Sequence, residues 1–260
     1  MGLFSRDNNA GPGVSKETPR KKGVPRFFEI IIREYRDLMK VNILFFICAL
    51  PSTTLFFLGL FDIFEFALIL SVAAAFPIGG AAAASMFCIT RMLRDDPGFL
   101  WDDFKRKFLE NLRQASIAGM FAATFLFTQV FLFWLPVMAD WEDVSIAWLI
   151  AMFALIIFFL MILPYIFLHY AYIKLGTFTI VKNSTFIALS NLGRSFMGAV
   201  TGLLPWFVLF FFFPLSLVFF PLIPFFVFVL SWLLTLLWVW PVFDRRFSIE
   251  ETLRMKREEQ

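Results

Sequence analysis

Long apolar runs recur along almost the whole chain after residue 42, and charged residues separate five of them. A bilayer core about 30 Å thick is crossed by about 20 helical residues, and backbone polar groups inside it must be paired within a helix. Each run therefore predicts a membrane-spanning helix. The runs are Ile43 to Phe61, Phe66 to Thr90, Ala115 to Ala139, Ser145 to Leu168, and Ser195 to Phe243.

The last run is too long for one crossing. It contains no charge, and at 1.5 Å per residue it would make a helix of about 74 Å. Pro221 and Pro224 predict a turn within it, because proline lacks an N–H donor and disfavours helix in the residue before it. The run then becomes two helices, and the pattern predicts an all-α membrane protein with six transmembrane helices.

Composition agrees with this fold class. Hydrophobic residues make up 60% of the chain and charged residues 17%. In a soluble domain about 45 to 50% of the residues are apolar and about 25% are charged. Residues 1–25 are rich in Gly, Pro and Lys/Arg and predict a disordered cytoplasmic tail. Residues 26–247 form the predicted six-helix membrane domain, and residues 248–260 a short charged cytoplasmic tail. No signal peptide is expected, since the first apolar run begins only at Ile43.

The basic residues predict the orientation. All 23 Lys and Arg fall before the first span, between Arg91 and Arg113, between Lys174 and Arg194, or after Phe243. The loops on the opposite side of the membrane have five charged residues, all acidic: Asp62, Glu65, Asp140, Glu142 and Asp143. Because Lys and Arg are retained in cytoplasmic loops, both termini are expected in the cytoplasm.

Three cytoplasmic segments have the period of amphipathic helices. The first, Phe27 to Asn42, has an apolar stripe and is either an interfacial elbow helix or a docking surface for a partner; the stripe is Phe28, Ile31, Ile32, Tyr35, Leu38, Met39 and Asn42. The second follows the turn Asp95 to Gly98, and its predicted apolar stripe is Trp101, Phe104, Phe108 and Leu112. Its wet face is predicted to hold Asp102, Asp103, Lys105, Arg106, Lys107 and Glu110, with Lys105 to Lys107 as lipid anchors. The third runs from about Lys174 to Arg194.

Few residues suggest chemistry. His169, the only histidine, is expected to be an interfacial structural residue rather than a proton relay, and Cys48 and Cys88 lie in apolar runs as small hydrophobes. The sequence has no phosphate-binding loop, zinc-binding helix or nucleophile elbow. We therefore expect no enzyme activity, no cofactor, no metal and no nucleic acid, and the lipid bilayer as the first partner.

The second predicted span is interrupted at Phe76-Pro77-Ile78-Gly79-Gly80. A broken helix at membrane depth can expose backbone groups that bind a transported ligand. Small residues at this spacing equally let a neighbouring helix approach closely. Pro77, Gly79, Gly80 and Ala84 are thus candidates for either a helix break or close helix packing.

Several short motifs resemble those of the YesL-like bacterial membrane proteins. They are Lys40-Val41-Asn42, Ile78-Gly79-Gly80-Ala81, Asp103-Phe104 with Phe108, Asn111 and Gln114, and Lys182-Asn183 with Ala188-Leu189. The resemblance covers roughly residues 25 to 200, and it departs from the family at Gly80, where many members have proline. Members are typical of Gram-positive bacteria, have no established activity, and tend to be encoded beside carbohydrate ABC importers and glycoside-degrading enzymes.

The resemblance implies a non-enzymatic accessory subunit or assembly factor of an ABC-type oligosaccharide importer, in contact with its permease or ATPase. A stand-alone carrier or channel for a small solute is the alternative. The candidate contacts with a partner or with lipid are Asp103, Phe104, Lys105, Arg106, Lys107, Phe108, Asn111, Lys182, Asn183 and Asn191.

The predicted orientation is testable with single cysteines. Cysteines placed near Asp62, Asp140 and Leu222 should react with a membrane-impermeant thiol reagent in intact cells. Cysteines near Gly98, Ser184 and Glu250 should not react until the membrane is opened. Any other labelling pattern contradicts the six-crossing orientation.

Overall fold

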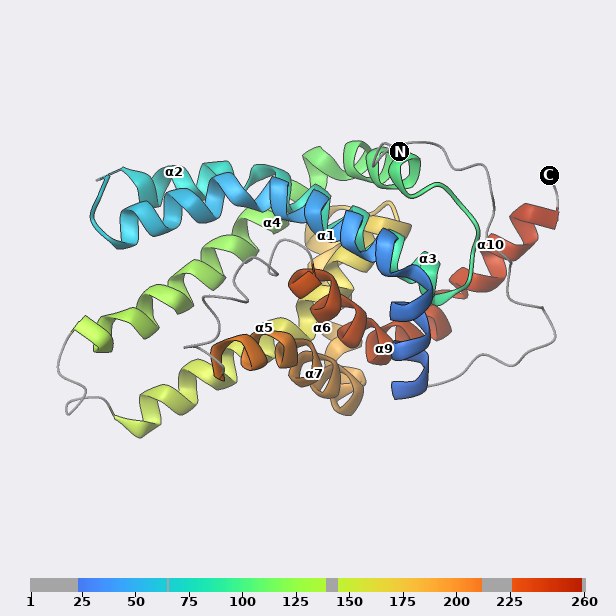
Figure 1. The fold of residues 1–260 in the computed structure, drawn as a ribbon. Helices are drawn as coiled ribbons and strands as arrows, with labels where there is room; N and C mark the ends of the chain where they lie inside the picture. Colours follow the sequence, from blue (N-terminus) through green and yellow to red (C-terminus); the bar gives the residue numbers. More distant parts are fainter. Residues whose placement is uncertain (1–22, 65, 139–144, 212–225, 259–260) are drawn as a thin grey trace.

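The computed structural model describes residues 23–64, 66–138, 145–211 and 226–258, all of them in helices or short connections (Figure 1). The helices are α1 (Val24–Leu60), α2 (Ala67–Ala74), α3 (Phe76–Leu93), α4 (Leu100–Met138), α5 (Ile146–Tyr172), α6 (Thr177–Ser190), α7 (Leu192–Phe211), α9 (Phe228–Phe247) and α10 (Ile249–Glu258). The turn predicted at Pro221 to Pro224, and residues 1–22 of the predicted tail, lie outside the described residues.

Six segments are long and apolar enough to cross a membrane. They are Pro25–Leu60, Ala67–Leu93, Leu100–Leu135, Ile146–Tyr172, Leu192–Leu209 and Phe228–Phe247. The predicted all-α fold with six spans is thereby confirmed, and the chain is a multi-pass integral membrane protein. The charged segment after Phe247 forms the short helix α10, which attaches to α9 where the Trp240 indole N–H donates to Glu250 at 3.2 Å.

Two of the predicted cytoplasmic helices are continuous with the spans that follow them. No proline or glycine lies between Phe27 and Leu50, so the amphipathic segment and the first span form one helix, α1. Its backbone leaves helical geometry at Glu34, with φ −112° and ψ 15°, and residues 24–33 turn away from the direction of the rest of α1 (Figure 1). We call residues 24–33 the elbow. The segment after Gly98 likewise continues into the third span as α4.

The face of α1 that packs inward coincides only in part with the stripe predicted from apolar residues. Ile30, Leu38 and Asn42 are buried, whereas Phe28 is 56% exposed and Ile32 is 76% exposed. Apolarity alone does not distinguish the two directions here, because lipid on one side and protein on the other both accept apolar side chains. The stripe is therefore divided between residues that pack inside the bundle and residues that face outward, where lipid or a partner would meet them.

The break in the second span lies at Ala75, between α2 and α3, and Pro77 occupies the first turn of α3. A proline there costs no hydrogen bond, because the first helical N–H groups lack intrahelical acceptors. From Gly79 onward α3 packs against α4 with backbone against backbone. A Cβ on Gly79 would lie 1.9 Å from the Ala115 carbonyl oxygen, and a Cβ on Gly119 would lie 2.5 Å from the Gly79 Cα.

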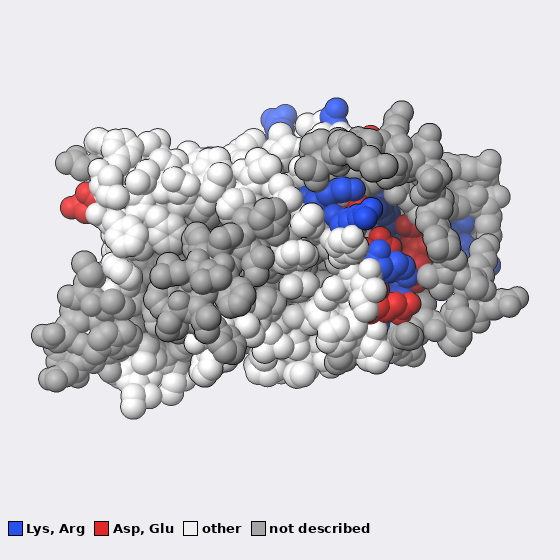
Figure 2. Space-filling model, in the orientation of Figure 1, with Lys and Arg blue, Asp and Glu red and all other residues white. Residues whose placement is uncertain are grey.

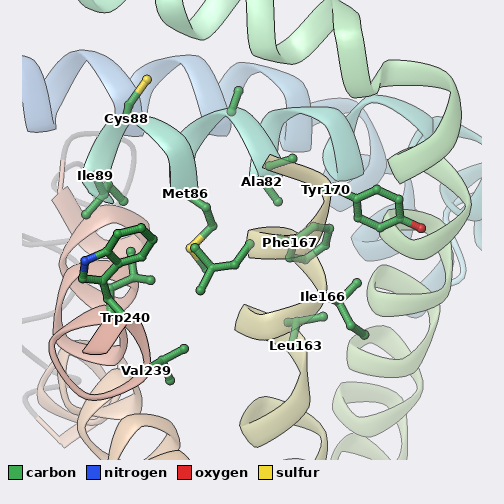
Figure 3. Packing of buried hydrophobic residues seen from close by; sticks show 14 of the residues in the cluster. Ala82, Met86, Cys88, Ile89, Leu163, Ile166, Phe167, Tyr170, Val239 and Trp240 are labelled. Carbon is green, nitrogen blue, oxygen red and sulfur yellow. The ribbon is translucent and has the colours of Figure 1, made fainter. Parts of the chain in front are cut away.

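The opposite side of α3 carries larger side chains into the core. Met86 and Ile89 of α3 meet Phe167 of α5 and Trp240 of α9 (Figure 3). Helix α3 is thus covered on several sides, since it contacts α1, α4, α5 and α9. A helix of small and apolar residues that is buried all round is expected at the centre of a membrane bundle.

A polar contact fixes the start of α9 inside the bundle. The buried Asn42 side-chain oxygen accepts a hydrogen bond from the Val229 N–H at 2.7 Å. This N–H belongs to the first turn of α9, where donors lack intrahelical partners, and an unpaired donor in hydrocarbon costs several kcal/mol. Asn42 therefore joins α1 to α9 at a point where water cannot satisfy the backbone.

Charged side chains gather at one end of the described molecule. On the face in Figure 2, Lys and Arg appear together with Asp and Glu at one end, and only acidic side chains appear at the other. We call the first of these the basic end; it holds Arg91, Arg94 and the start of α4. Ser184 lies near this end but is fully buried, so the exposed Lys182 is the better position for a labelling cysteine on α6.

The close approach of α3 and α4 predicts that Gly79→Ala destabilises the protein by about 1 to 3 kcal/mol or more, because the added methyl overlaps the Ala115 backbone. Gly193→Ala is the matched control, since no atom lies within 4 Å of the Cβ that it adds. Unfolding midpoints in mild detergent measure both. Equal stability of Gly79→Ala and the parent would show that the two helices do not approach this closely.

Candidate functional site at the basic end

The turn between α3 and α4 holds several acidic side chains in fixed positions. Asp95 has a positive φ of 58°, a left-handed conformation that aspartate tolerates better than most residues. Gly98 closes the turn, and a Cβ there would lie 2.8 Å from the Arg91 guanidinium and 3.0 Å from the Asp103 carboxylate. The turn can therefore pass directly over an ion pair only because this residue has no side chain.

Asp95 binds the elbow of α1. Its carboxylate pairs with Arg26 at 2.7 Å and with Arg33 at 2.6 Å. The same two guanidinium groups also donate to main-chain carbonyls at the end of α3, Arg26 to Leu93 at 2.8 Å and Arg33 to Met92 at 3.3 Å. These carbonyls are among those that a helix C-terminus leaves without intrahelical partners. The elbow is thus attached to α3 by side-chain and main-chain acceptors together.

A second ion pair lies between α3 and α4. Arg91, which is 6% exposed, pairs with Asp103 in the first turn of α4, and Asp103 also pairs with Arg106 at 2.5 Å. An acidic side chain in a first helical turn is stabilised by the helix dipole. The prediction that Asp103 belongs to a solvated face is wrong, because the side chain faces Arg91 beneath the turn.

Arg94 connects the turn to α5 and α9. It pairs with Asp96 at 2.7 Å and donates to the Tyr172 hydroxyl at 2.6 Å. The guanidinium also lies over the Tyr172 ring, 5.4 Å from its centroid, and over the Trp240 ring at 5.2 Å. Burial lowers the pKa of Arg94, but Tyr172 and Asp96 together raise this pKa by more. The buried guanidinium therefore stays charged.

We call these residues the arginine–aspartate cluster: Arg26, Arg33, Arg91, Arg94, Asp95, Asp96 and Asp103. It joins α1, α3, α4, α5 and α9 at one level of the bundle. Each of its arginines has a carboxylate partner, as a buried charge requires if it is not to destabilise the fold. The arrangement can position helices, and its charges are already occupied with one another.

Some of the residues predicted to contact a partner are buried in the structure, and others are exposed. Phe104 is buried and stacks with Phe108, their centroids 6.2 Å apart. Lys107 is partly buried, pairs with the exposed Glu110 at 3.1 Å and lies over the Phe87 ring.

The predicted asparagines make local contacts or lie partly covered. Asn111 is buried and donates to the Lys107 carbonyl, while Asn191 ends α6 by donating to the Ile187 carbonyl at 3.2 Å. Asn183 is partly buried. Lys105, Arg106 and Lys182 are the predicted contacts that lie exposed.

His169 lies in the last turn of α5 and is fully buried. Its Nδ1 lies 2.8 Å from the Tyr165 carbonyl and 3.0 Å from the Ser184 hydroxyl, and its ring meets Phe243 and Phe247 edge to face. These contacts join α6 to α5 and α9. Both His169 and Ser184 lie inside the bundle without exposed surface.

From the sequence, the arginines of the cluster predicted only the orientation of the helices. Their ion pairs with aspartates were not predicted. A usable signal was present: Arg91-x-x-Arg94-Asp95-Asp96 places both charges together at the end of an apolar helix, with Asp103 one turn into the next. Opposite charges so placed face one another when the two helices pack antiparallel. In the part of the chain that the structure describes, no three His, Cys, Asp or Glu residues are grouped to hold a metal ion.

We expect Asp95→Asn to lower stability by about 3 kcal/mol or more, because it leaves two partly buried guanidinium groups without their carboxylate. Asparagine also tolerates a left-handed backbone, so the change tests the charge rather than the turn. Asp62→Asn is the control: Asp62 is exposed and has φ 55°. Thermal unfolding in detergent should separate the two variants. Similar losses in both would mean that the cluster contributes little.

Comparison of the chain with models of protein families, with curated proteins and with solved structures finds no match. The resemblance to the YesL-like proteins accordingly stays a prediction from the sequence motifs.

Proposed function

We propose that the protein is a non-enzymatic accessory subunit or assembly factor that docks onto an ABC-type carbohydrate importer of the bacterial cell membrane. The proposal takes the partner class from the resemblance of the sequence motifs. The observation that carries the docking role is an exposed stripe with an aromatic residue and a basic residue at the basic end of α4.

That stripe consists of Trp101, Lys105 and Leu109, which lie four residues apart on α4 and so share one face of the helix. Trp101 is 47% exposed and Leu109 58% exposed. Aromatic residues are enriched at protein interfaces, and a large exposed apolar group flanked by charge is typical of a contact site. We call these three residues the α4 docking stripe.

The interrupted second span supports docking over transport. A carrier would need Pro77 to Gly80 to line a polar cavity, yet Gly79 and Gly80 are buried against the α4 backbone and Ala84 is fully buried. The small residues therefore serve helix contact within the described bundle. The proposed orientation places the basic end, and with it the docking stripe, in the cytoplasm, where the ATPase and the inner loops of a permease lie.

The double variant Trp101→Ala/Lys105→Glu tests the proposal. It should lose the co-purifying permease or ATPase from mild detergent and lower glycan uptake by cells, while membrane insertion and unfolding midpoint stay at parent values. Arg106 and Lys107 are left unchanged because they pair with Asp103 and Glu110, so the double variant alters the docking stripe alone.

Phe121→Ala is the matched control, because Phe121 is an exposed apolar residue of the same helix, 73% exposed, further along the span. It should keep the partner. Retention of the importer by the double variant would contradict the docking stripe. Saturable sugar flux by the purified chain alone in liposomes would contradict the accessory role and favour the carrier alternative.

A further inference from the structure

Helix α6 has two opposite faces. The inner face is buried in the bundle and consists of Ile180, Ser184, Ile187 and Ala188. The opposite face is exposed and consists of Phe178, Lys182, Phe186 and Leu189. These four residues recur at intervals of three and four, which places them on one side of the helix. We call them the α6 outer face, and its two phenylalanines are 84% and 63% exposed.

Contacts of the inner face show how α6 lies against α5. The Ser184 hydroxyl lies 3.0 Å from Nδ1 of His169. Further along, the Ser195 hydroxyl donates to the Ala188 carbonyl at 3.0 Å and lies 3.2 Å from the Tyr165 hydroxyl. Tyr165 and His169 are one helical turn apart and both precede the end of α5. Helix α6 therefore packs against the side of α5, and the α6 outer face points sideways, away from the bundle.

The same contacts place α6 at the boundary of the membrane. Helix α5 has 27 residues, which is about 40 Å at 1.5 Å per residue. This length equals a hydrocarbon core of about 30 Å together with most of the headgroup layers, so the end of α5 at Tyr172 lies among headgroups. Tyr165 lies about 10 Å deeper along the helix, near the edge of the hydrocarbon. Leu189, next to the Ala188 that is joined to this level, is therefore placed beside acyl chains.

The charge of this segment complements an anionic surface. From Val144 to Phe243 the sequence has no Asp or Glu, and its charged residues are Lys174, Lys182 and Arg194. All three side chains are exposed. Helices that lie in the plane of a membrane and bind anionic lipids combine such basic residues with aromatic and aliphatic ones. Helix α6 thus offers apolar side chains and positive charge at the level where a bilayer presents acyl chains and phosphates.

We infer that the α6 outer face inserts Phe178, Phe186 and Leu189 into the leaflet at the basic end, with Lys182 on the phosphates of anionic phospholipids. The long apolar stem of a lysine lets its ammonium reach the headgroups while the neighbouring rings lie deeper. The inference does not depend on the importer proposal, because the α6 outer face and the α4 docking stripe lie on different helices.

A bimane fluorophore on single cysteines tests the insertion in vesicles that contain the purified protein. Phe178→Cys and Phe186→Cys receive it in a Cys48→Ala background, and Cys88 stays because it has no exposed surface. Nitroxide-labelled phospholipid should quench both positions strongly, and iodide on both sides of the membrane should quench them weakly. Strong quenching by iodide alone would place the face in water and overturn the inference. Weak quenching by both would overturn it as well and assign the face to a second copy of the chain.

Two reference positions calibrate the quenchers. Phe121 is 73% exposed within the α4 span, so bimane at Phe121→Cys should respond to the lipid quencher alone. Glu251 is an exposed charged residue of α10, so bimane at Glu251→Cys should respond to iodide.

The phosphate contact is tested at Phe178→Cys with nitroxide-labelled phosphatidylglycerol and phosphatidylcholine. At equal mole fraction phosphatidylglycerol should quench several-fold more effectively. Lys182→Gln should lower this preference about fivefold, the factor that one basic residue near an anionic surface contributes. Lys182→Arg is the matched control, because it keeps the charge, and it should retain the preference. Equal quenching by the two lipids before Lys182 is changed, or a preference that Lys182→Gln leaves intact, would overturn the inference.

Discussion

The contact between α3 and α4 is the constraint on which the rest of the bundle depends. Inside a membrane no hydrophobic driving force brings helices together, so they associate through close packing and polar contacts. Gly79 and Gly119 allow the two backbones to touch, and the gain is dispersion contact along the whole crossing. With α4 held on its small-residue side, α3 presents Met86 and Ile89 to the helices α5 and α9, and the core forms around them.

The arginine–aspartate cluster continues this contact beyond the apolar part of the helices. The same α3–α4 pair that meets at Gly79 ends in a turn whose carboxylates face arginines from α1 and α3. Removing a single partner from a buried ion pair leaves an uncompensated charge. Any arrangement of these helix ends that separates the pairs is therefore less stable. The pairing therefore selects the position of the elbow of α1, which apolar packing alone would leave undetermined.

The membrane-spanning segments were predictable because leaving backbone groups unpaired in hydrocarbon costs much free energy. Each apolar segment avoids this cost by forming a helix, which depends on its own residues alone. The apolar segments follow from that cost, while the break before Pro77 and the division of the last run follow from the prolines. The inward faces did not follow: Phe28 and Ile32 face outward while Arg26 is buried. At the membrane boundary lipid and protein both accept apolar side chains, so periodicity does not say which face is internal. The pairing of Arg91 with Asp103 depends on two helices meeting at one level, which no local pattern specifies.

The burial of arginine and the exposure of apolar residues also explain which parts of the outer surface are available for contacts. Because the buried arginines are occupied by the turn, the elbow directs Phe28 and Ile32 outward, and α4 directs Trp101 outward in the same way. Exposed apolar groups at this level must meet headgroups, acyl chains or another protein, since water would penalise them. The α4 docking stripe is one such surface, and the proposed occupant there is a protein. A bundle whose buried arginines are paired within the fold thus leaves its exposed apolar residues for contacts with lipid or with protein.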